Sequence, residues 1–204
     1  MEKGEMRMKS KRIILSTVIL ALAAFFVSSI GYFHPKPRVF KESFEEGFGE
    51  WILGADVPPD LNNPEHTVAW NITRSTDVSK TGQYSLKLFL DGRQDDGTIW
   101  VARRISPAGG RIVRIRVSFQ LYSESESFNT IAAVCGYIGL RKPLREDDFT
   151  VLGPANTVKG WETYSYETEL STGLTGEAWV AVGISVRWEK FMTYYIDDVE
   201  IFLE

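Results

Sequence analysis

The sequence is poor in the residues that most often build metal sites and nucleophilic sites. Cys135 is the single cysteine, so an internal disulfide framework is excluded. The only histidines are His34 and His66, and neither a His-x-x-x-His nor a paired-cysteine spacing is present, which argues against a zinc site. A glycine-rich phosphate loop is also missing. Cys135 stands in an apolar segment and is best interpreted as a small buried side chain.

Catalytic groups are equally scarce. The sequence contains three pairs of adjacent acids, Asp95-Asp96, Asp147-Asp148 and Asp197-Asp198. Paired carboxylates hydrolyse glycosidic bonds in many enzymes. Adjacent acids, however, more often belong to a solvated loop or turn than to a catalytic site. We therefore predict that the protein is not an enzyme.

Acidic residues outnumber basic ones beyond the N-terminal segment. Residues 1–33 contain five basic and two acidic residues and carry a net charge of +3, so the rest of a chain of net charge −4 carries −7. Binding to phosphate backbones relies on a basic surface. The acidic remainder therefore argues against nucleic acid as the main partner.

The one long run without charge is at the N-terminus. Residues 1–12 are polar and basic, and residues 13–33, IILSTVILALAAFFVSSIGYF, form 21 uncharged positions, enough to cross a bilayer as a helix. The basic flank predicts that residue 1 stays in the cytoplasm and that the chain after residue 33 is exported. The segment is either a retained anchor at the cell membrane, with the C-terminal domain outside, or a signal cleaved near its small residues, which releases a secreted protein. Residues 34–38 contain two prolines and are predicted to be a short extended linker.

Helical periodicity is almost absent from residues 39–204, and β-branched and aromatic runs replace it. With 44% hydrophobic residues, the chain can form a sizeable core. Gly-, Pro- and Asn-containing turns separate the runs, which is typical of an antiparallel β-sandwich or barrel. The longer irregular pieces, 56–65 and 140–156, are predicted to be loops. The nine predicted strands are Val39–Glu45, Thr67–Arg74, Tyr84–Leu90, Thr98–Ile105, Arg111–Tyr122, Asn129–Ile138, Trp161–Leu170, Ala178–Trp188 and Phe191–Leu203.

Alternation within the strands assigns their faces. Odd positions from 113 to 121 and even positions from 180 to 186 are apolar, so one face of each strand is predicted to be core and the other to meet solvent or ligand. In the last strand, the adjacent acids Asp197 and Asp198 point to opposite faces if the strand is regular. One of them then points inward or into a cleft and needs a compensating partner. Asp197 has the same parity as Val199, Ile201 and Leu203.

Three short motifs occur in a characteristic order. They are Phe44-Glu45-Glu46-Gly47 followed by Trp51, then Gly82-Gln83-Tyr84-Ser85-Leu86-Lys87-Leu88, and finally Tyr195-Ile196-Asp197-Asp198-Val199. Together they resemble the galactose-binding-like jelly rolls, especially carbohydrate-binding modules attached to secreted polysaccharide-degrading enzymes. The resemblance covers residues 39–204. It implies an all-β fold, an antiparallel two-sheet jelly-roll sandwich, preceded here by one N-terminal hydrophobic helix that serves as a signal or anchor.

In that family a structural calcium ion often lies between the first strand, the loop before the Tyr-Ser-Leu strand and an aspartate of the last strand. The resemblance therefore implies a Ca²⁺ site formed by Glu45 and Asp197, with backbone carbonyls near Lys80 and Gly82. Such an ion takes six to eight oxygen ligands and would offset a buried aspartate. The alternative is that Asp197 accepts hydrogen bonds from backbone N–H groups or arginine.

The family's sugar sites lie on a sheet face or at loops near the sandwich edge. A sugar presents an apolar C–H face and a hydroxyl rim, so its site needs flat aromatic rings beside polar donors and acceptors. The alternative is that these tryptophans pack and these arginines are merely solvated. The candidates by strand face are Arg114, Arg116, Gln120 and Tyr122, then Trp179 and Arg187, and finally Trp100 and Arg104.

Two functions from different classes follow. The first is a non-catalytic, membrane-anchored or secreted domain that binds a polysaccharide or a cell-surface glycan. The second is a structural protein of the cell surface that binds protein partners or copies of itself through exposed strand edges. Asn71-Ile72-Thr73 also fits a glycosylation sequon.

Overall fold

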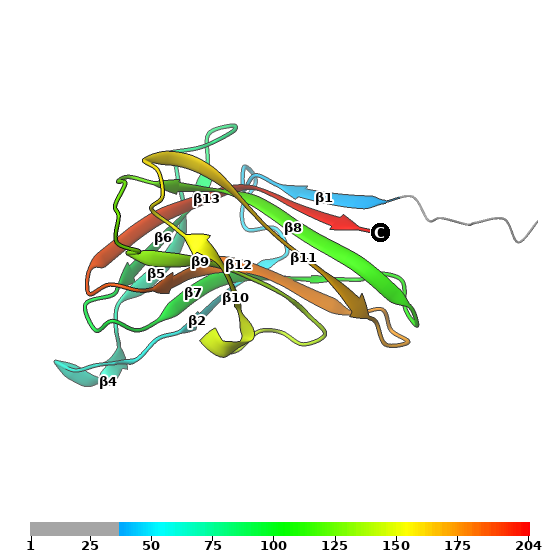
Figure 1. The fold of residues 1–204 in the computed structure, drawn as a ribbon, viewed down its shortest axis with the longest axis horizontal. Coiled ribbons are helices and arrows are strands. Elements are labelled where there is room, and N and C mark those ends of the chain that lie inside the picture. Colours follow the sequence, from blue (N-terminus) through cyan, green and yellow to red (C-terminus); the bar gives the residue numbers. More distant parts are fainter. Residues whose placement is uncertain (1–36) are drawn as a thin grey trace, which may run out of the picture. The chain divides into compact units, whose positions relative to one another are not determined.

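The computed structural model describes residues 37–204, which form one β-sandwich (Figure 1). The predicted hydrophobic helix 13–33 and most of the linker 34–38 lie outside the described residues. Within the described part, no helix has the length and apolar character needed to cross a membrane. The prediction of an all-β antiparallel sandwich is confirmed for residues 37–204.

Two antiparallel sheets form the layers of the sandwich. In the first sheet, β13 (Phe191–Leu203) pairs with β6 (Ser85–Asp91) through its N-terminal half and with β1 (Arg38–Glu42) through its C-terminal half. A small hairpin of β3 (Pro59–Asp60) and β4 (Asn63–Thr67) projects from one end (Figure 1). The first sheet has the order β11 (Gly160–Ser171), β8 (Ile112–Ser123), β13 (Phe191–Leu203), β6 (Ser85–Asp91) and β5 (Trp70–Ser75), with β1 (Arg38–Glu42) added to β13. The second sheet has the order β10 (Thr150–Pro154), β9 (Ala132–Gly139), β12 (Ala178–Val186), β7 (Thr98–Ile105) and β2 (Trp51–Asp56).

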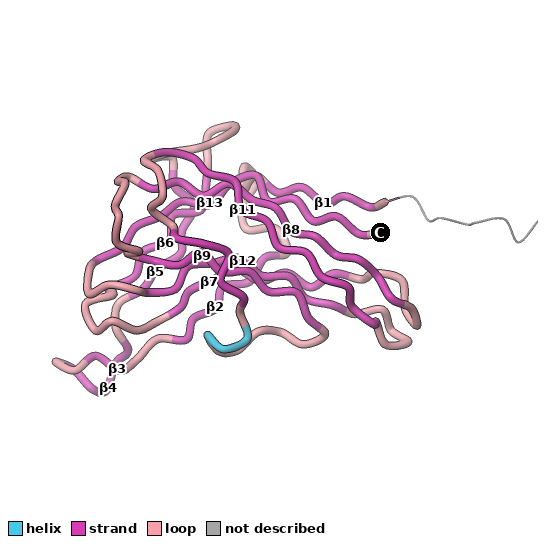
Figure 2. The backbone as a smooth tube through the Cα atoms, in the orientation of Figure 1, coloured by secondary structure: helices cyan, strands magenta, loops and turns pink. Residues whose placement is uncertain are grey.

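All nine predicted strands are present, but the sequence missed several short ones. β2 was missed because Gly54 interrupts its alternation, and β10 because Gly153 and Pro154 end it after a few residues. Both are edge strands that pair with one neighbour, so their formation depends more on tertiary pairing than on the β-propensity of their residues. The predicted loop 56–65 contains most of the β3–β4 hairpin, and the predicted loop 140–156 contains β10 and a short 3₁₀ turn, η1 (Glu146–Asp148) (Figure 2).

The core lies between the two sheets and follows the predicted alternation. Five odd positions of β8, from Val113 to Leu121, and four even positions of β12, from Val180 to Val186, are buried in one apolar cluster. The intervening side chains point to the outer faces of the two sheets. Each sheet therefore presents one outer face on which a ligand site can be built.

A β-bulge in β13 changes the predicted faces of that strand. The register against β8 shifts between Asp197 and Glu200, and Asp198 has a backbone φ of 48°. Tyr194 and Ile196 belong to the core before the bulge, whereas Val199 and Ile201 belong to it afterwards. The prediction that Asp197 shares a face with Val199 is therefore wrong, because the extra residue reverses the parity.

Asp197 is fully buried, but not between the sheets. It lies opposite Gln120 on the outer face of the first sheet, where the loop 76–84 covers it. At this point the end of β1, the start of β6 and the bulge of β13 meet. The bulge thus makes room for a carboxylate that fastens a loop.

The bulge predicts an unusual order of stability at position 198. A left-handed backbone favours glycine, whereas alanine there is strained. Asp198→Gly and Asp198→Ala both remove the carboxylate that accepts a hydrogen bond from Thr81 Oγ1. We therefore expect the glycine variant to be more stable than the alanine variant by about 1 kcal/mol in urea unfolding. In a regular strand the order is reversed, so an equal or more stable alanine variant would contradict the assigned bulge.

Candidate functional site

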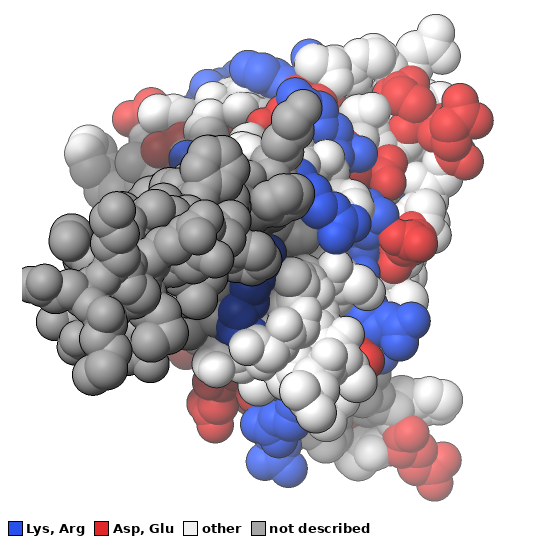
Figure 3. Space-filling model, turned by 90° about the vertical axis from the view of Figure 1, so that its right-hand side faces the viewer, with Lys and Arg blue, Asp and Glu red and all other residues white. Residues whose placement is uncertain are grey.

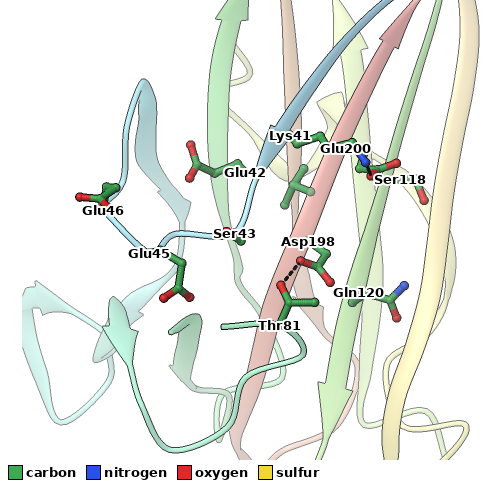
Figure 4. Close-up of a pocket in the computed structure, with 11 residues that line it drawn as sticks. Lys41, Glu42, Ser43, Glu45, Glu46, Thr81, Ser118, Gln120, Asp198 and Glu200 are labelled. Carbon is green, nitrogen blue, oxygen red and sulfur yellow. Dashed lines mark hydrogen bonds and ion pairs between the residues drawn. The ribbon is translucent and has the colours of Figure 1, made fainter. Parts of the chain in front are cut away.

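A strongly acidic pocket of about 560 Å³ lies where β1, β13 and the loop 76–84 meet (Figure 4). Five of its lining residues are acids, and Lys41 forms an ion pair with Glu200. Figure 4 shows Thr81 reaching Asp198 from the covering loop, with an Oγ1–Oδ1 distance of 2.6 Å. The pocket is lined by Lys41, Glu42, Ser43, Glu45, Glu46, Thr81, Ser118, Gln120, Asp198, Val199 and Glu200.

Asp197 and Glu45 both bind the covering loop through its backbone N–H groups. The Asp197 Oδ2 atom accepts from the N–H groups of Lys80 at 2.7 Å and Thr81 at 3.1 Å, and its Oδ1 atom accepts from Asp198 N–H at 2.7 Å. The Glu45 Oε1 atom accepts from two further N–H groups of the loop, those of Gln83 at 3.0 Å and Tyr84 at 2.9 Å. Burial raises the pKa of Asp197, and the three N–H bonds oppose that rise.

Arg74 positions Glu45 through hydrogen bonds to the backbone of residues 44 and 45. Its Nε atom donates to the carbonyl of Phe44 at 2.7 Å, and its Nη2 atom donates to the carbonyl of Glu45. The guanidinium also lies 3.9 Å from the centre of the Tyr84 ring. Because Phe44 has a positive φ of 60°, these bonds hold a turn that is unfavourable for a bulky residue. One arginine thus ties the segment after β1 to the start of β6.

These contacts fit the predicted calcium ion poorly. Calcium binds oxygen atoms, but the loop presents N–H donors to both carboxylates. The Gly82 carbonyl accepts from the Ser79 hydroxyl at 3.2 Å. Among residues 37–204, no group of three or more His, Cys, Asp or Glu side chains is arranged to hold a metal. Calcium at Glu45, Asp197, Lys80 and Gly82 stays a prediction, and the contacts found here match its alternative, acceptance of backbone N–H bonds.

Four of the eight predicted sugar-binding residues lie along β8 on the outer face of the first sheet, and each contacts a neighbouring side chain. Arg114 forms ion pairs with Glu169 at 3.0 Å and Glu167 at 3.7 Å. Arg116 lies 4.3 Å from the centre of the Phe202 ring. The Gln120 Nε2 atom donates to Thr163 Oγ1 at 2.8 Å. The centre of the Tyr122 ring lies 5.3 Å from that of Trp161 and 5.9 Å from that of Tyr195.

Charged side chains of both signs also occur on the surface near the start of β1 (Figure 3). Figure 3 shows acidic and basic side chains interspersed at that end of the domain. The outer face of the first sheet is thus a charged surface whose arginines already have partners, rather than an open aromatic platform.

The other four predicted residues, Trp100, Arg104, Trp179 and Arg187, lie on the opposite outer face, that of the second sheet. The eight residues therefore do not form one site, since the core separates the two groups. Arg104 and Arg187 are exposed and Trp179 is half-buried. Trp100 is only 2% exposed, so no ring face is open to a ligand.

The loop 140–149 covers the middle of the second sheet. Its Phe149 ring lies 5.0 Å from the Trp100 ring and 5.9 Å from the Tyr137 ring, measured between centroids. Trp100 in turn lies on Gly54, where a Cβ atom would overlap the indole. Five outward side chains of this sheet are buried, namely Thr98, Ala102, Cys135, Ala181 and Ser185. Burial raises the pKa of the Cys135 thiol, consistent with its interpretation as a small buried side chain.

Glu146 fastens this loop to the sheet. Its carboxylate accepts hydrogen bonds from Thr98 Oγ1 at 2.6 Å, Ser185 Oγ at 2.9 Å and Arg187 Nη1 at 3.0 Å. Its backbone N–H donates to Asp56 Oδ2 at 2.9 Å. Burial raises the pKa of Glu146, but the three hydrogen bonds together outweigh burial and hold that pKa below its usual range. The loop is therefore tied to β2, β7 and β12 by an ionised carboxylate and an N–H group.

An open groove remains at one end of this sheet, and two exposed aromatic side chains line it. Phe128 is wholly exposed, Trp188 is 52% exposed, and the cavity between the loops that carry them measures about 560 Å³. Arg187, one of the predicted residues, also lines it. The full lining is Phe128, Asn129, Thr130, Ala133, Val151, Gly153, Pro154, Arg187 and Trp188.

The sequence analysis missed both aromatic residues of this groove. Trp188 was placed at the end of a strand, although β12 ends at Val186 and Trp188 lies in the turn that follows. Phe128 stands alone in the polar segment Ser123-Glu124-Ser125-Glu126-Ser127-Phe128-Asn129. A single aromatic residue in such a loop has no strand to pack in. An isolated aromatic residue in a polar loop is the feature of the sequence that indicates a binding role.

Comparisons with known proteins agree with the fold. No protein-family model matches the sequence, and no curated protein matches it as a relative. A solved structure of carbohydrate-binding modules from the β-sandwich superfamily, described as having promiscuous specificity, matches with a TM-score of 0.50 and 16% identity over 85% of this chain and 77% of that one. The predicted resemblance to galactose-binding-like jelly rolls is thereby confirmed at the level of fold.

Two further solved structures match with lower scores. TmCBM61 in complex with β-1,4-galactotriose has a TM-score of 0.47 and 18% identity, covering 79% of this chain and 94% of that one. The CBM22-1 xylan-binding domain from Paenibacillus barcinonensis Xyn10C has a TM-score of 0.43 and 14% identity, covering 80% of this chain and 92% of that one.

The N–H contacts of Asp197 and Glu45 predict that the domain does not need calcium for stability. We expect the same melting temperature in EDTA and in excess CaCl₂, because backbone donors already satisfy both carboxylates. Thermal unfolding followed by circular dichroism measures this. Asp197→Ala, which removes three acceptor contacts at a buried position, should lower the stability by about 2–3 kcal/mol in either buffer. A melting temperature that falls in EDTA would instead support the calcium site.

Proposed function

We propose that the β-sandwich of residues 37–204 is a non-catalytic carbohydrate-binding domain whose site is the groove between Phe128 and Trp188. The observation that carries this proposal is a pair of exposed aromatic side chains that line one cavity of about 560 Å³. The fold shared with solved carbohydrate-binding modules supports it as an analogy.

The chemistry of the groove suits a sugar. Aromatic rings stack on the apolar C–H face of a pyranose, while its hydroxyl rim needs hydrogen-bonding groups at the side. Phe128 and Trp188 provide the rings, and Asn129, Thr130 and Arg187 provide polar groups. An aromatic ring exposed to water gains nothing for folding, so two such rings beside one cavity are better explained by a binding role.

The lining also supports binding without bond cleavage. Arg187 is the only titratable side chain among the nine residues that line the groove. Glycoside hydrolysis requires two carboxyl groups that flank the scissile bond. For the groove itself we therefore propose binding without bond cleavage.

The cellular setting is part of the proposal. Residues 13–33 place the domain outside the cell, either anchored in the membrane or released after cleavage, because the uncharged run follows a basic segment. A domain displayed in this way would hold polysaccharides or glycans of a neighbouring surface.

The two groove aromatics give the first test. A glycan array identifies a ligand for residues 37–204, and titration calorimetry then compares variants. We expect Trp188→Ala and Phe128→Ala each to weaken binding about tenfold or more, since each removes a stacking surface. Both rings are exposed, so melting temperatures should change little.

Matched controls separate the groove from other surfaces. Phe191→Ala removes a ring of the same exposure, 51%, outside the groove and should leave affinity unchanged. Arg116→Ala tests the outer face of the first sheet and should also leave it unchanged. If only Arg116→Ala lost affinity, the site would lie on the outer face of the first sheet instead. An array without any bound glycan would contradict the proposed function.

The free edge of β2 favours assembly as a second candidate function. β2 pairs only with β7 among the described strands, and its Ile52 and Leu53 are 38% and 40% exposed. Such an edge can accept a strand from another copy. Under this function the mass measured by sedimentation rises with concentration. Leu53→Lys should then abolish association, because a charge blocks edge pairing. A monomer at every concentration would contradict assembly without affecting the carbohydrate proposal.

A further inference from the structure

A second, smaller cavity adjoins the groove and is lined in part by the loop 140–149. This cavity of about 250 Å³ shares Val151 and Arg187 with the groove. Exposed aromatic side chains line the groove, whereas this cavity has polar lining residues: Thr98, Ser185, Glu146 and Asp147. The outer part of the combined site therefore offers stacking surfaces, and the inner part offers hydrogen-bonding groups.

The inner end is closed by packing. Beyond it, the ring of Phe149 covers Trp100, and the outward positions Ala102 and Ala181 are fully buried. A glycan chain lying along the sheet would have to displace this ring from its contacts with Trp100 and Tyr137. The outer face of the second sheet thus provides no path for a long chain.

The closing loop is also fixed by hydrogen bonds on both sides and within itself. The Glu146 carboxylate holds β7 and β12, and its N–H group holds Asp56 at the end of β2. Within the loop, Asp148 Oδ2 accepts from the N–H groups of Leu144 at 2.8 Å and Arg145 at 3.1 Å. Opening the loop would break the Glu146 contacts to the three strands together, so the blind end belongs to the folded domain.

We propose that the site binds the end of a glycan chain rather than its interior. This inference rests on the proposed carbohydrate-binding function and specifies its ligand. The terminal sugar occupies the blind cavity, where its hydroxyl groups donate to the carboxylates of Glu146 and Asp147. The next sugar stacks between Phe128 and Trp188, and the rest of the chain leaves through the open side of the groove.

The charge of the blind end selects among terminal sugars. Two carboxylates, of Glu146 and Asp147, face one guanidinium, of Arg187, which is already bound to Glu146. Carboxylates accept hydrogen bonds from neutral hydroxyl groups but repel another carboxylate. The preferred end is therefore a neutral sugar, and a terminal uronic acid is disfavoured.

Chain length provides the test. Calorimetry is run on residues 37–204 with β-1,4-linked galacto-, manno- and xylo-oligosaccharides, from monosaccharide to hexasaccharide, and with the corresponding polymers. For the series that binds, we expect the affinity to rise up to the disaccharide or trisaccharide and then to stay constant. A polymer should bind in proportion to its concentration of chain ends.

Two other results have different meanings. An affinity that still rises up to the hexasaccharide, with several domains bound along each polymer chain, would overturn end recognition but leave carbohydrate binding intact. Absence of binding to every sugar of the three series and to a wider glycan array would overturn the proposed function itself.

A variant pair tests the blind end directly. Asp147 is exposed at the blind end, and Asp147→Ala should weaken binding about tenfold at every chain length, because every ligand places its terminal sugar there. Glu65→Ala removes an equally exposed carboxylate from β4 and should leave affinity unchanged. Unchanged affinity in Asp147→Ala would contradict the orientation proposed here.

Discussion

The first sheet depends on the contact between two carboxylates and the backbone of one loop. Asp197 and Glu45 accept N–H bonds from four residues of the loop 76–84, and these bonds join the segment after β1, the start of β6 and the middle of β13. Three chain segments that are distant in sequence are thereby fixed at one point. Because ionised carboxylates form short, strong bonds to backbone N–H groups, the closure needs no disulfide, in keeping with the single cysteine of the chain.

The fold was largely predictable because most of its strands are regular. In β8 and β12 the apolar alternation continues without interruption, so parity alone identifies the buried face. In β13 the same reasoning failed after Asp197, since a bulge shifts the parity by one residue. A pair of acids in a strand does not specify a bulge, although aspartate tolerates the left-handed backbone better than most residues. The positions of the bulge and of the short edge strands depend on tertiary pairing.

The candidate site was much less predictable, because exposure depends on contacts between distant segments. Trp100 alternates outward in β7 as predicted, yet Phe149, 49 residues later, covers it. Conversely, Phe128 and Trp188 are in turns, where alternation gives no information. Only Arg187 was both predicted and found in the groove. A strand pattern can therefore indicate which side chains leave the core, but not which of them remain open to a ligand.

Covering one sheet face has a consequence for how stability and binding are distributed. The aromatic residues on the middle of the second sheet, Trp100, Phe149 and Tyr137, pack against one another and contribute to folding. Under the proposed function, recognition falls to side chains on turns at the end of the sheet, and these turns can change without disturbing the core. Since Phe128 and Trp188 bury little surface, their identity is free to follow the ligand. Under the proposed end recognition the closed face also limits the ligand, because the loop that buries Trp100 is the wall against which a bound chain ends.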